Sequence, residues 1–310
     1  MRTTTATTDL DDDTRAQISA LIARAVETDG VEPVSEQGML RLRGGAEPTR
    51  HLVSRQDRSV AGYAQLDVDS ASAEVVVDPS RRQHGIGRTL VDELIVDSGP
   101  GLRVWAHGDL PSAAALAASR GFERVRALWQ MSRPLAGQLP EPQVPDGVVV
   151  DTFTPGVDDA DWVRLNAAVF ARHPEQGRLT LADLRDRMGL PWFDPAGFLV
   201  ARRSGHMVGF HWTKVPDVTT GEVYVVGVDA AERGTGLGRA LTLVGLHHLR
   251  SSGLDTVTLY VDEDNQPAIR LYVALGFTRV AVDVMYAPRP AHARPTQPSP
   301  AHDHEGLAVP

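Results

Sequence analysis

The chain has 310 residues, of which 42% are hydrophobic, 31 are basic, 40 are acidic and none is cysteine. This length is enough for two domains of ordinary size, and the net charge of −9 argues against a nucleic-acid partner held by charge alone. The lack of cysteine excludes disulfides and thiolate metal sites, and no apolar run suits a signal peptide or a membrane span. We therefore expect a monomeric protein of the cytoplasm that binds no metal, nucleic acid or membrane.

The first part of the chain predicts alternating helices and strands. The Thr-rich residues 1–10 are expected to be frayed. Asp11 to Thr14 mark a helix start, because the helix dipole favours acidic residues near its N-terminus. Glu36 falls between this helix and the first strands, where the simplest interpretation is a solvated loop acid. Strands are predicted at 51–55, 60–67, 73–78, 102–106 and 125–131, and helices after the third strand as far as Val96 and at 112–119.

Residues 134–147 include four prolines and few apolar residues, which predicts a linker. Beyond it, helices are predicted at 158–168 and 181–188, and strands at 198–202, 207–214, 222–228 and 256–261. Residues 287–310 are rich in proline, alanine and histidine and are expected to form a disordered tail. The predicted units are therefore 1–133 and 148–286, with the linker 134–147 between them and the tail 287–310 at the end.

A strand, a glycine-rich turn and a helix follow one another around residues 223–249, and the turn reads Arg-x-x-Gly-x-Gly from Arg233 to Gly238. This layout points backbone N–H groups and a helix dipole at an anion, usually a phosphate. There is no Gly-Lys-Ser/Thr and no complete GxGxxG followed by an acid about 20 residues later, which excludes a triphosphate P-loop and a Rossmann dinucleotide site.

The glycine turn occurs twice, because residues 77–88 align with 228–239 without a gap at an offset of 151. Each copy is followed by a helix, a strand and a helix that ends in Gly-Phe. In the second copy the last helix reads Asn-x-x-Ala-x-x-Leu-Tyr from Asn265 to Tyr272. The whole pattern resembles the GNAT acetyltransferase family, whose pyrophosphate loop is (Gln/Arg)-x-x-Gly-x-(Gly/Ala). The resemblance implies an α/β fold with a mixed α+β sheet, built as two tandem GNAT (acyl-CoA N-acyltransferase) domains.

The GNAT resemblance also implies acetyl-CoA as the co-substrate. The second copy would bind it through Val226, Gly227, Val228, Arg233, Gly234, Thr235, Gly236, Leu237, Gly238, Arg239, Asn265, Gln266, Pro267, Ala268, Ile269 and Arg270. The first copy would use Val75, Val76, Val77, Gln83, His84, Gly85, Ile86, Gly87 and Arg88. Aligning the two Gly-Phe pairs puts Ala117 where the second copy has Tyr272. We therefore expect the first unit to bind CoA without catalysing, although its loop could also be a turn without a ligand.

Acetyl transfer to an amine needs one group that accepts a proton from the amine and another that donates a proton to the CoA thiolate. Glu222, on the strand before the loop, is the candidate for the first role, and Tyr272 is the family's candidate for the second. Their alternative interpretations are a surface acid at a strand start and a core aromatic. No covalent enzyme intermediate is required, because holding donor and acceptor together supplies much of the rate enhancement.

A closer resemblance is to the mycothiol synthase family, and it extends over residues 10–287. Its specific parts are the segments 34–36, 173–177, 209–214 and 221–228. That family acetylates the cysteinyl amine of a cysteine–glucosamine–inositol conjugate (desacetylmycothiol), so the resemblance implies a small-molecule partner that is a thiol-sugar amine. The implied substrate contacts are Glu36, Glu175, Lys214, Glu222 and Tyr260, and Glu36 would reach across from the first unit.

Two other functions stay open at this point. A tandem GNAT that acts on a drug amine, a polyamine or a protein N-terminus would share every CoA-binding residue, but would not need Glu36, Glu175 and Lys214. A non-catalytic acyl-CoA sensor would have lost its acid and base groups in both copies, whereas the second copy keeps Glu222 and Tyr272. Lys214 is the one lysine among the 31 basic residues, which favours a functional role over a surface one.

Overall fold

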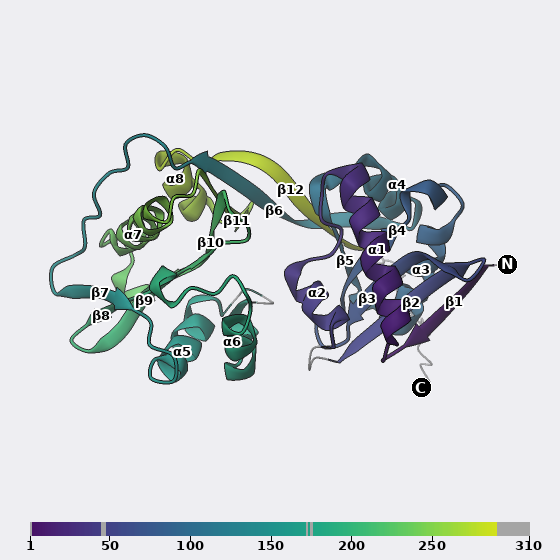
Figure 1. The fold of residues 1–310 in the computed structure, drawn as a ribbon, viewed down its shortest axis with the longest axis horizontal. Helices are drawn as coiled ribbons and strands as arrows, with labels where there is room; N and C mark the ends of the chain where they lie inside the picture. Colours follow the sequence, from purple (N-terminus) through teal and green to yellow (C-terminus); the bar gives the residue numbers. More distant parts are fainter. Residues whose placement is uncertain (1, 45–47, 172, 174–175, 290–310) are drawn as a thin grey trace, which may run out of the picture.

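The computed structural model describes residues 2–44, 48–171, 173 and 176–289. The chain forms two lobes, and two long strands cross between them (Figure 1). The first lobe is the part of the chain before residue 122, and the second lobe is the part from residue 148 to residue 277. None of the helices in the described residues combines the length and the apolar character that crossing a membrane requires.

One mixed sheet of twelve strands runs through both lobes in the order β1-β2-β3-β4-β5-β12-β6-β11-β10-β9-β8-β7. Its strands are β1 (Arg2–Thr7), β2 (Thr49–Gln56), β3 (Ser59–Asp67), β4 (Ser72–Val77), β5 (Arg103–Ala106), β6 (Phe122–Pro134), β7 (Val148–Thr152), β8 (Phe198–Arg203), β9 (His206–Lys214), β10 (Thr220–Val228), β11 (Thr256–Asp262) and β12 (Thr278–Pro288). The pairs β4–β5 and β10–β11 are parallel, and the other neighbours are antiparallel.

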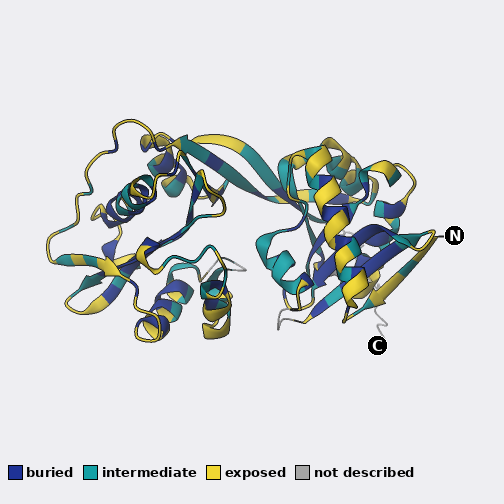
Figure 2. Cartoon of the chain, in the orientation of Figure 1, coloured by how far each residue is buried: buried dark blue, intermediate teal, exposed yellow. Residues whose placement is uncertain are grey.

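Helices cover both faces of the sheet in each lobe. They are α1 (Asp12–Asp29), α2 (Glu36–Leu42), α3 (Ile86–Ser98), α4 (Pro111–Ser119), α5 (Asp159–Val169), α6 (Leu181–Met188), α7 (Leu237–Ser251) and α8 (Gln266–Ala274). In the first lobe α1 and α2 pack on one face and α3 on the other. In the second lobe α5 and α6 share one core cluster, while α7 and α8 share another. Figure 2 shows the buried positions along the strands and on the inward sides of these helices.

The first helix shows how the sequence specifies this packing. Ile18, Leu21, Ile22 and Ala25 recur at helical spacing, and all four are buried against the sheet. The side chain of Asp11 caps the helix by accepting a hydrogen bond from the N–H of Thr14 at 2.6 Å. The burial of one apolar stripe therefore fixes the face that α1 turns toward the sheet.

The last strands of the two repeats are exchanged between the lobes. β5 pairs with β12 rather than with β6, and β6 lies between β12 and β11. The pairing of β6 with β12 runs from Phe122 opposite Pro288 to Ser132 opposite Thr278, where the two strands cross between the lobes (Figure 1). Each lobe's sheet is thus completed by a strand that the other repeat supplies.

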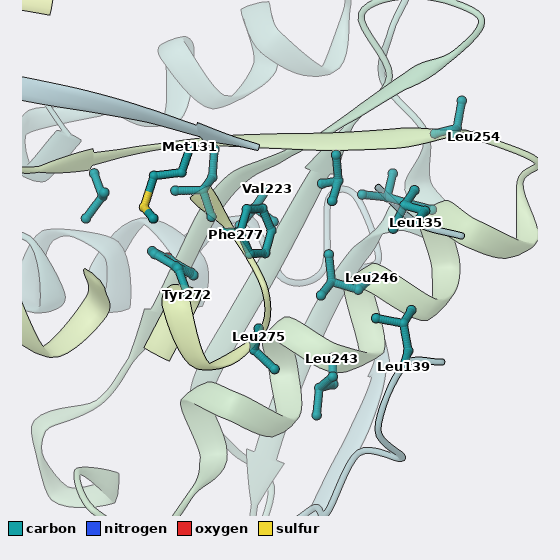
Figure 3. Packing of buried hydrophobic residues seen from close by; sticks show 14 of the residues in the cluster. Met131, Leu135, Leu139, Val223, Leu243, Leu246, Leu254, Tyr272, Leu275 and Phe277 are labelled. Carbon is teal, nitrogen blue, oxygen red and sulfur yellow. The ribbon is translucent and has the colours of Figure 1, made fainter. Parts of the chain in front are cut away.

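The segment after β6 is also part of the second lobe's core. Met131 of β6 packs in the same buried cluster as Leu246, Tyr272 and Phe277, as do Leu135 and Leu139 (Figure 3). Both leucines lie in the residues expected to form a linker, and both are buried. The segment that joins β6 to β7 is thus attached to the second lobe, because two well-spaced leucines are enough to hold an otherwise proline-rich segment on an apolar surface.

Two expectations about local structure were wrong. The start of the chain is not frayed: β1 pairs with β2 from Arg2 opposite Gln56 to Thr7 opposite His51. β-Branched threonines suit an extended edge strand, and the edge of β2 offers them backbone partners. β12 also continues through Ala287 and Pro288, which were expected to begin the tail. The other residues of the expected tail, from 290 onward, lie outside the described residues.

Glu36 is not a loop residue either, because it is the first residue of α2. The side chain of Ser35 caps this helix by accepting a hydrogen bond from the N–H of Gly38 at 3.2 Å. The Ser-x-x-Gly cap is local, but the helix that follows is only seven residues long and carries a glycine. Its formation therefore depends on packing, which periodicity cannot reveal.

The packing of β6 makes a prediction about stability. Met131 is 1% exposed in the second lobe's core, and we expect Met131→Ala to lower the free energy of unfolding by about 2–5 kcal/mol, because it leaves a cavity. Val125, on the same strand, is 50% exposed, and Val125→Ala is the control, with an expected change within about 0.5 kcal/mol. Urea denaturation measures both. A similarly small effect of the two substitutions would contradict the contribution of β6 to that core.

Candidate active site

The sheet opens between β10 and β11. Their parallel pairing joins Thr220–Val223 to Thr256–Leu259, and among the described residues it stops there. The pairing of β10 with β9 continues to Val228 after a register shift between Val223 and Val225. A bulge of this kind bends a strand away from its neighbour. The backbone of residues 224–228, which includes the predicted contacts Val226, Gly227 and Val228, is therefore not paired with β11 among the described residues.

The glycine turn after β10 has the geometry that suits an anion. Gly236 caps α7 with a φ of +92° and has no side chain to accept from the first N–H groups of this helix, of which that of Leu237 donates to Thr235 Oγ1 at 3.3 Å. The side chain of Asp229 accepts a hydrogen bond from the N–H of Ala231 at 2.8 Å, which fixes the turn before it. Arg233 and Arg239 are exposed on either side of the helix start. Free N–H groups, the helix dipole and two guanidinium groups together suit a pyrophosphate.

Residues 265–270, at the start of α8, were all predicted to contact CoA, but two of them have structural contacts of their own. Asn265 caps this helix, and its side chain accepts a hydrogen bond from the N–H of Ala268 at 3.3 Å. Ile269 is buried in the core, whereas Gln266, Pro267 and Arg270 are exposed. The exposed residues at this helix start are free to contact a ligand, while Asn265 and Ile269 hold the helix in place.

Tyr272 is buried on the inward face of α8. Its ring meets Phe277 in an edge-on contact with 5.8 Å between the ring centroids (Figure 3). Burial raises the pKa of Tyr272 to about 12, so that its hydroxyl stays protonated at neutral pH. A neutral phenol can donate a proton or a hydrogen bond to a thiolate that forms beside it.

Three charged side chains from two lobes meet next to the opening. Lys214 of β9 lies directly opposite Glu222 of β10, and its Nζ is 3.8 Å from Glu222 Oε2. The same Nζ is 2.8 Å from Oε1 of Glu36, which comes from α2 of the first lobe. The side chains of Lys214 and Glu222 are each 12% exposed, and that of Glu36 is 31% exposed. The structure therefore brings these three sequence-predicted residues together.

Aromatic side chains surround this charged group. Lys214 Nζ lies 5.2 Å from the ring centroid of Trp192 and 5.3 Å from that of Tyr224, which adds cation–π attraction. Trp192 Nε1 donates a hydrogen bond to Glu36 Oε1 at 2.8 Å, and Arg187 Nε donates one to the Tyr224 hydroxyl at 3.0 Å. The sequence analysis missed these three residues. Tyr224 could have been found, because it alternates with Glu222 along the strand before the loop.

The charges around Glu222 determine its protonation. Burial raises the pKa of Glu222, the positive charge of Lys214 lowers it, and the negative charge of Glu36 raises it again, with a net upward shift. Tyr260 of β11 is 45% exposed, and its pKa is raised by burial and by the negative charges of Glu222 and Asp283. A carboxylate with a raised pKa beside an opening in the sheet is suited to accept a proton. Glu175, the remaining predicted contact, lies outside the described residues.

The first lobe contains a cavity of about 460 Å³, within the range of small-molecule sites. Of the residues predicted to bind CoA in the first copy, those that line it are Val75, Val76, Val77, Gln83, Gly85, Ile86, Gly87 and Arg88. Gly85 caps α3 with a φ of +80°, in the same way as Gly236 caps α7. His84 is exposed, and its Nδ1 lies 2.7 Å from the carbonyl oxygen of Arg82.

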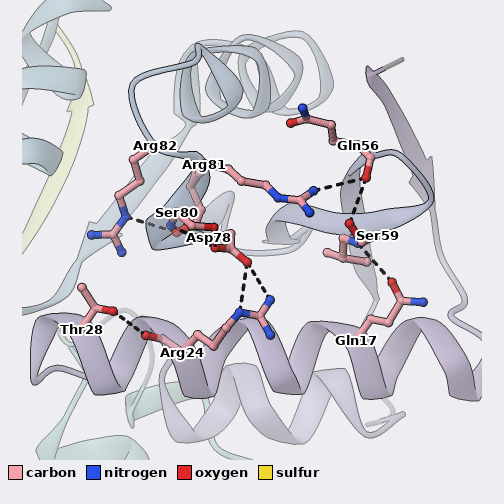
Figure 4. Close-up of polar contacts among 11 residues, drawn as sticks. Gln17, Arg24, Thr28, Gln56, Ser59, Asp78, Ser80, Arg81 and Arg82 are labelled. Carbon is pink, nitrogen blue, oxygen red and sulfur yellow. Dashed lines mark hydrogen bonds and ion pairs between the residues drawn. The ribbon is translucent and has the colours of Figure 1, made fainter.

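The first loop is braced by α1, as Figure 4 shows for Arg24 and Asp78. Arg24 Nη2 donates to Asp78 Oδ2 at 2.7 Å, and Arg82 pairs with Asp29 of the same helix at 2.6 Å. Arg233, which aligns with Arg82, is exposed instead. The two loops thus share their backbone shape but differ in what holds their arginines.

Comparison with known proteins gives concordant results. A family model described as the Acetyltransferase (GNAT) family matches residues 166–277. A mycothiol acetyltransferase of Thermomonospora curvata is 57% identical, covering 89% of this chain and 94% of its own. One of Thermobispora bispora is 56% identical, covering 87% and 94%.

Two solved structures resemble the whole chain. A GCN5-related N-acetyltransferase from Sphaerobacter thermophilus has a TM-score of 0.66 and 28% identity, covering 93% of this chain and 96% of its own. A tandem GNAT protein from the clavulanic acid biosynthesis pathway has a TM-score of 0.69 and 23% identity, covering 94% and 100%, which shows the fold. The expected fold, two GNAT units around a mixed sheet, is confirmed.

The raised pKa of Glu222 gives a pH-dependent prediction. The folded protein favours the protonated form of Glu222. The contribution of this group to the stability of the folded state is therefore full below the ordinary pKa of 4.5, and it is lost as pH rises through the higher pKa of the folded protein. Glu222→Gln should therefore be more stable than the wild type at neutral pH, with a gain that shrinks as pH falls through the raised folded pKa of Glu222 and is lost below 4.5. Urea denaturation across this range measures the difference, with the exposed Glu141→Gln as the control. A gain that grows toward low pH would contradict the assignment.

Proposed function

Because the chain belongs to the mycothiol acetyltransferase family, we propose that its second lobe transfers the acetyl group of acetyl-CoA to the cysteinyl amine of desacetylmycothiol, giving mycothiol. The chain is an acetyltransferase of mycothiol biosynthesis. The observation that carries the proposed site is the meeting of Glu36, Lys214 and Glu222 beside the gap between β10 and β11.

Acetyl-CoA would lie in that gap. The N–H groups at the start of α7 would hold its pyrophosphate, and the free backbone of Val226 and Val228 would hold the pantetheine arm. In this arrangement the thioester would lie between the strand that carries Glu222 and the helix that carries Tyr272. The amine would enter from the side of α2, where Glu36 and Lys214 offer partners to the hydroxyl-rich sugar.

The reaction then needs no covalent enzyme intermediate. Glu222 accepts a proton from the ammonium form of the substrate, whose α-amino pKa is near 8. The amine nitrogen forms a bond to the thioester carbonyl carbon, the carbon–sulfur bond breaks, and Tyr272 donates a proton to the leaving thiolate. The nitrogen gives up its second proton to the solvent as the neutral amide forms. The products are the amide and CoA thiol, and both catalytic groups return to their starting states by exchange with solvent.

The first unit, residues 1–133, would bind acyl-CoA in its cavity without catalysing. At the offset of 151, Ala71 stands where the second unit, residues 148–286, has Glu222, and aligning the two Gly-Phe pairs puts Ala117 where it has Tyr272. Ala117 also lines the cavity, so an apolar wall faces any ligand there. The charged group formed by Glu36, Lys214 and Glu222 needs no second chain, in keeping with a monomer that acts on a small molecule; the cytoplasm is proposed as its location.

The two glycine caps, Gly236 and Gly85, allow a matched test of the proposal that the second unit catalyses while the first only binds acyl-CoA. Gly236→Glu and Gly85→Glu place the same anionic side chain at equivalent left-handed positions, where it strains the backbone and repels a pyrophosphate. We expect Gly236→Glu to abolish CoA release with acetyl-CoA and desacetylmycothiol, and Gly85→Glu to keep turnover while losing one of two acyl-CoA sites in calorimetric titration. Turnover with spermidine or a peptide amine in place of the sugar conjugate would contradict the proposed substrate.

Tyr272→Phe tests the proposed acid. The substitution removes one hydroxyl from a buried ring, so folding and acetyl-CoA binding should be retained, whereas kcat should fall by about a hundredfold or more. Steady-state kinetics with a thiol reagent measure the fall, and Tyr286→Phe, on β12 beside the cavity of the first lobe, serves as the control. An unchanged kcat would leave Tyr272 with a packing role alone.

A further inference from the structure

α2 is the element through which the first lobe reaches the proposed active site. Its first residue, Glu36, contacts Lys214 and Trp192, and its second, Gln37, accepts a hydrogen bond from Arg187 Nη2 at 2.8 Å. Figure 1 shows α2 at the side of the first lobe that faces the second. Whatever fixes α2 in the first lobe therefore fixes the distance of Glu36 from Glu222.

The backbone of α2 rests directly on a buried polar pair. Gln65 Nε2 donates to Glu74 Oε2 at 2.6 Å, and a Cβ added at Gly38 would lie 2.0 Å from the first atom and 2.3 Å from the second. Glu74 Oε1 also accepts a hydrogen bond from the N–H of Ser35, the cap residue of α2, at 2.8 Å. Glycine at position 38 is thus required for this close approach, and the same carboxylate accepts a hydrogen bond at the cap of α2 and lies against the backbone at Gly38.

His107 in turn holds Glu74. Its Nε2 lies 3.2 Å from Glu74 Oε1, and its Nδ1 lies 3.1 Å from Oδ2 of Asp283 on the exchanged strand β12. Burial lowers the pKa of His107, but hydrogen bonds to Asp283 and Glu74 outweigh it and raise the pKa to about 10. A charged imidazole between two buried carboxylates compensates charges that would otherwise be costly to bury.

We propose that Gly38, Glu74 and His107 are positioning residues for the amine substrate, acting through α2 to set where Glu36 stands relative to Lys214 and Glu222. None of the three belongs to the second lobe, and none lies in the gap between β10 and β11. They act on affinity for the amine, not on acetyl-CoA. The inference rests on the proposed function, because it requires the amine to bind between Glu36 and Glu222.

Gly38→Ala is the main test. The added methyl group must displace α2 or break the Gln65–Glu74 pair, so KM for desacetylmycothiol should rise by about tenfold to a hundredfold, with KM for acetyl-CoA unchanged. Gly62→Ala is the matched control: it is also buried in the first lobe, and its methyl group would crowd Ile86 and Leu90 of α3 instead. An equal rise in both variants would overturn the proposal, because general loosening of the lobe would then explain it.

A double-mutant cycle with Glu36→Gln separates positioning from stability. If Gly38 acts through Glu36, Gly38→Ala should add little to the KM of the Glu36→Gln enzyme, whereas fully additive effects would overturn the proposal. If Gly38→Ala does not fold, Glu74→Gln keeps the side-chain shape, removes the charge that pairs with His107 and carries the same expectations. Wild-type turnover on desacetylmycothiol is measured first. Its absence would refute the proposed function, whereas normal turnover with unchanged KM in Gly38→Ala would refute the positioning alone.

Discussion

β6 and β12 run side by side where the two lobes meet, and their antiparallel pairing decides which surfaces of the lobes face each other. β6 brings Met131 into the core that also holds Tyr272, and β12 brings Asp283 to His107. The same crossing places α2 within reach of Lys214. The core of the catalytic half and the assembly of its charged group therefore depend on one pair of strands.

The charged group itself combines opposing electrostatic demands. Glu222 must be able to accept a proton, which its burial and the nearby Glu36 favour, yet two carboxylates close together would repel each other. Lys214 lies between them and compensates both, while Trp192 and Tyr224 keep its ammonium away from bulk water. An arrangement of this kind is stable only if α2 stays in place, which links the stability of the first lobe to the chemistry of the second.

Local features of the site could be predicted from the sequence, and non-local ones could not. Gly85 and Gly236 were predictable as helix caps, because a strand, a glycine turn and a helix are specified by neighbouring residues. The position of β6 in the sheet was not predictable. Its pattern of apolar and polar residues would suit pairing with either β5 or β12, and only the complete set of strand pairings determines which of them is its neighbour. The need for glycine at position 38 could not be predicted, because it arises from the close approach of the Glu74 carboxylate, 36 positions later in the chain. The reach of Glu36 into the second half came from family resemblance, not from spacing.

The strand order has a consequence for the history of the chain. Read from its two ends, the sheet matches strand for strand, β1 with β7 through β5 with β11, and β12 with β6 at the centre. The junction is thus pseudo-symmetric and self-complementary, the kind that two identical units can form by exchanging a strand. Once two such units share one gene, each copy can diverge under its own selection. One copy could then lose its acid and base while it was retained for the strand and the helix that it lends to the other.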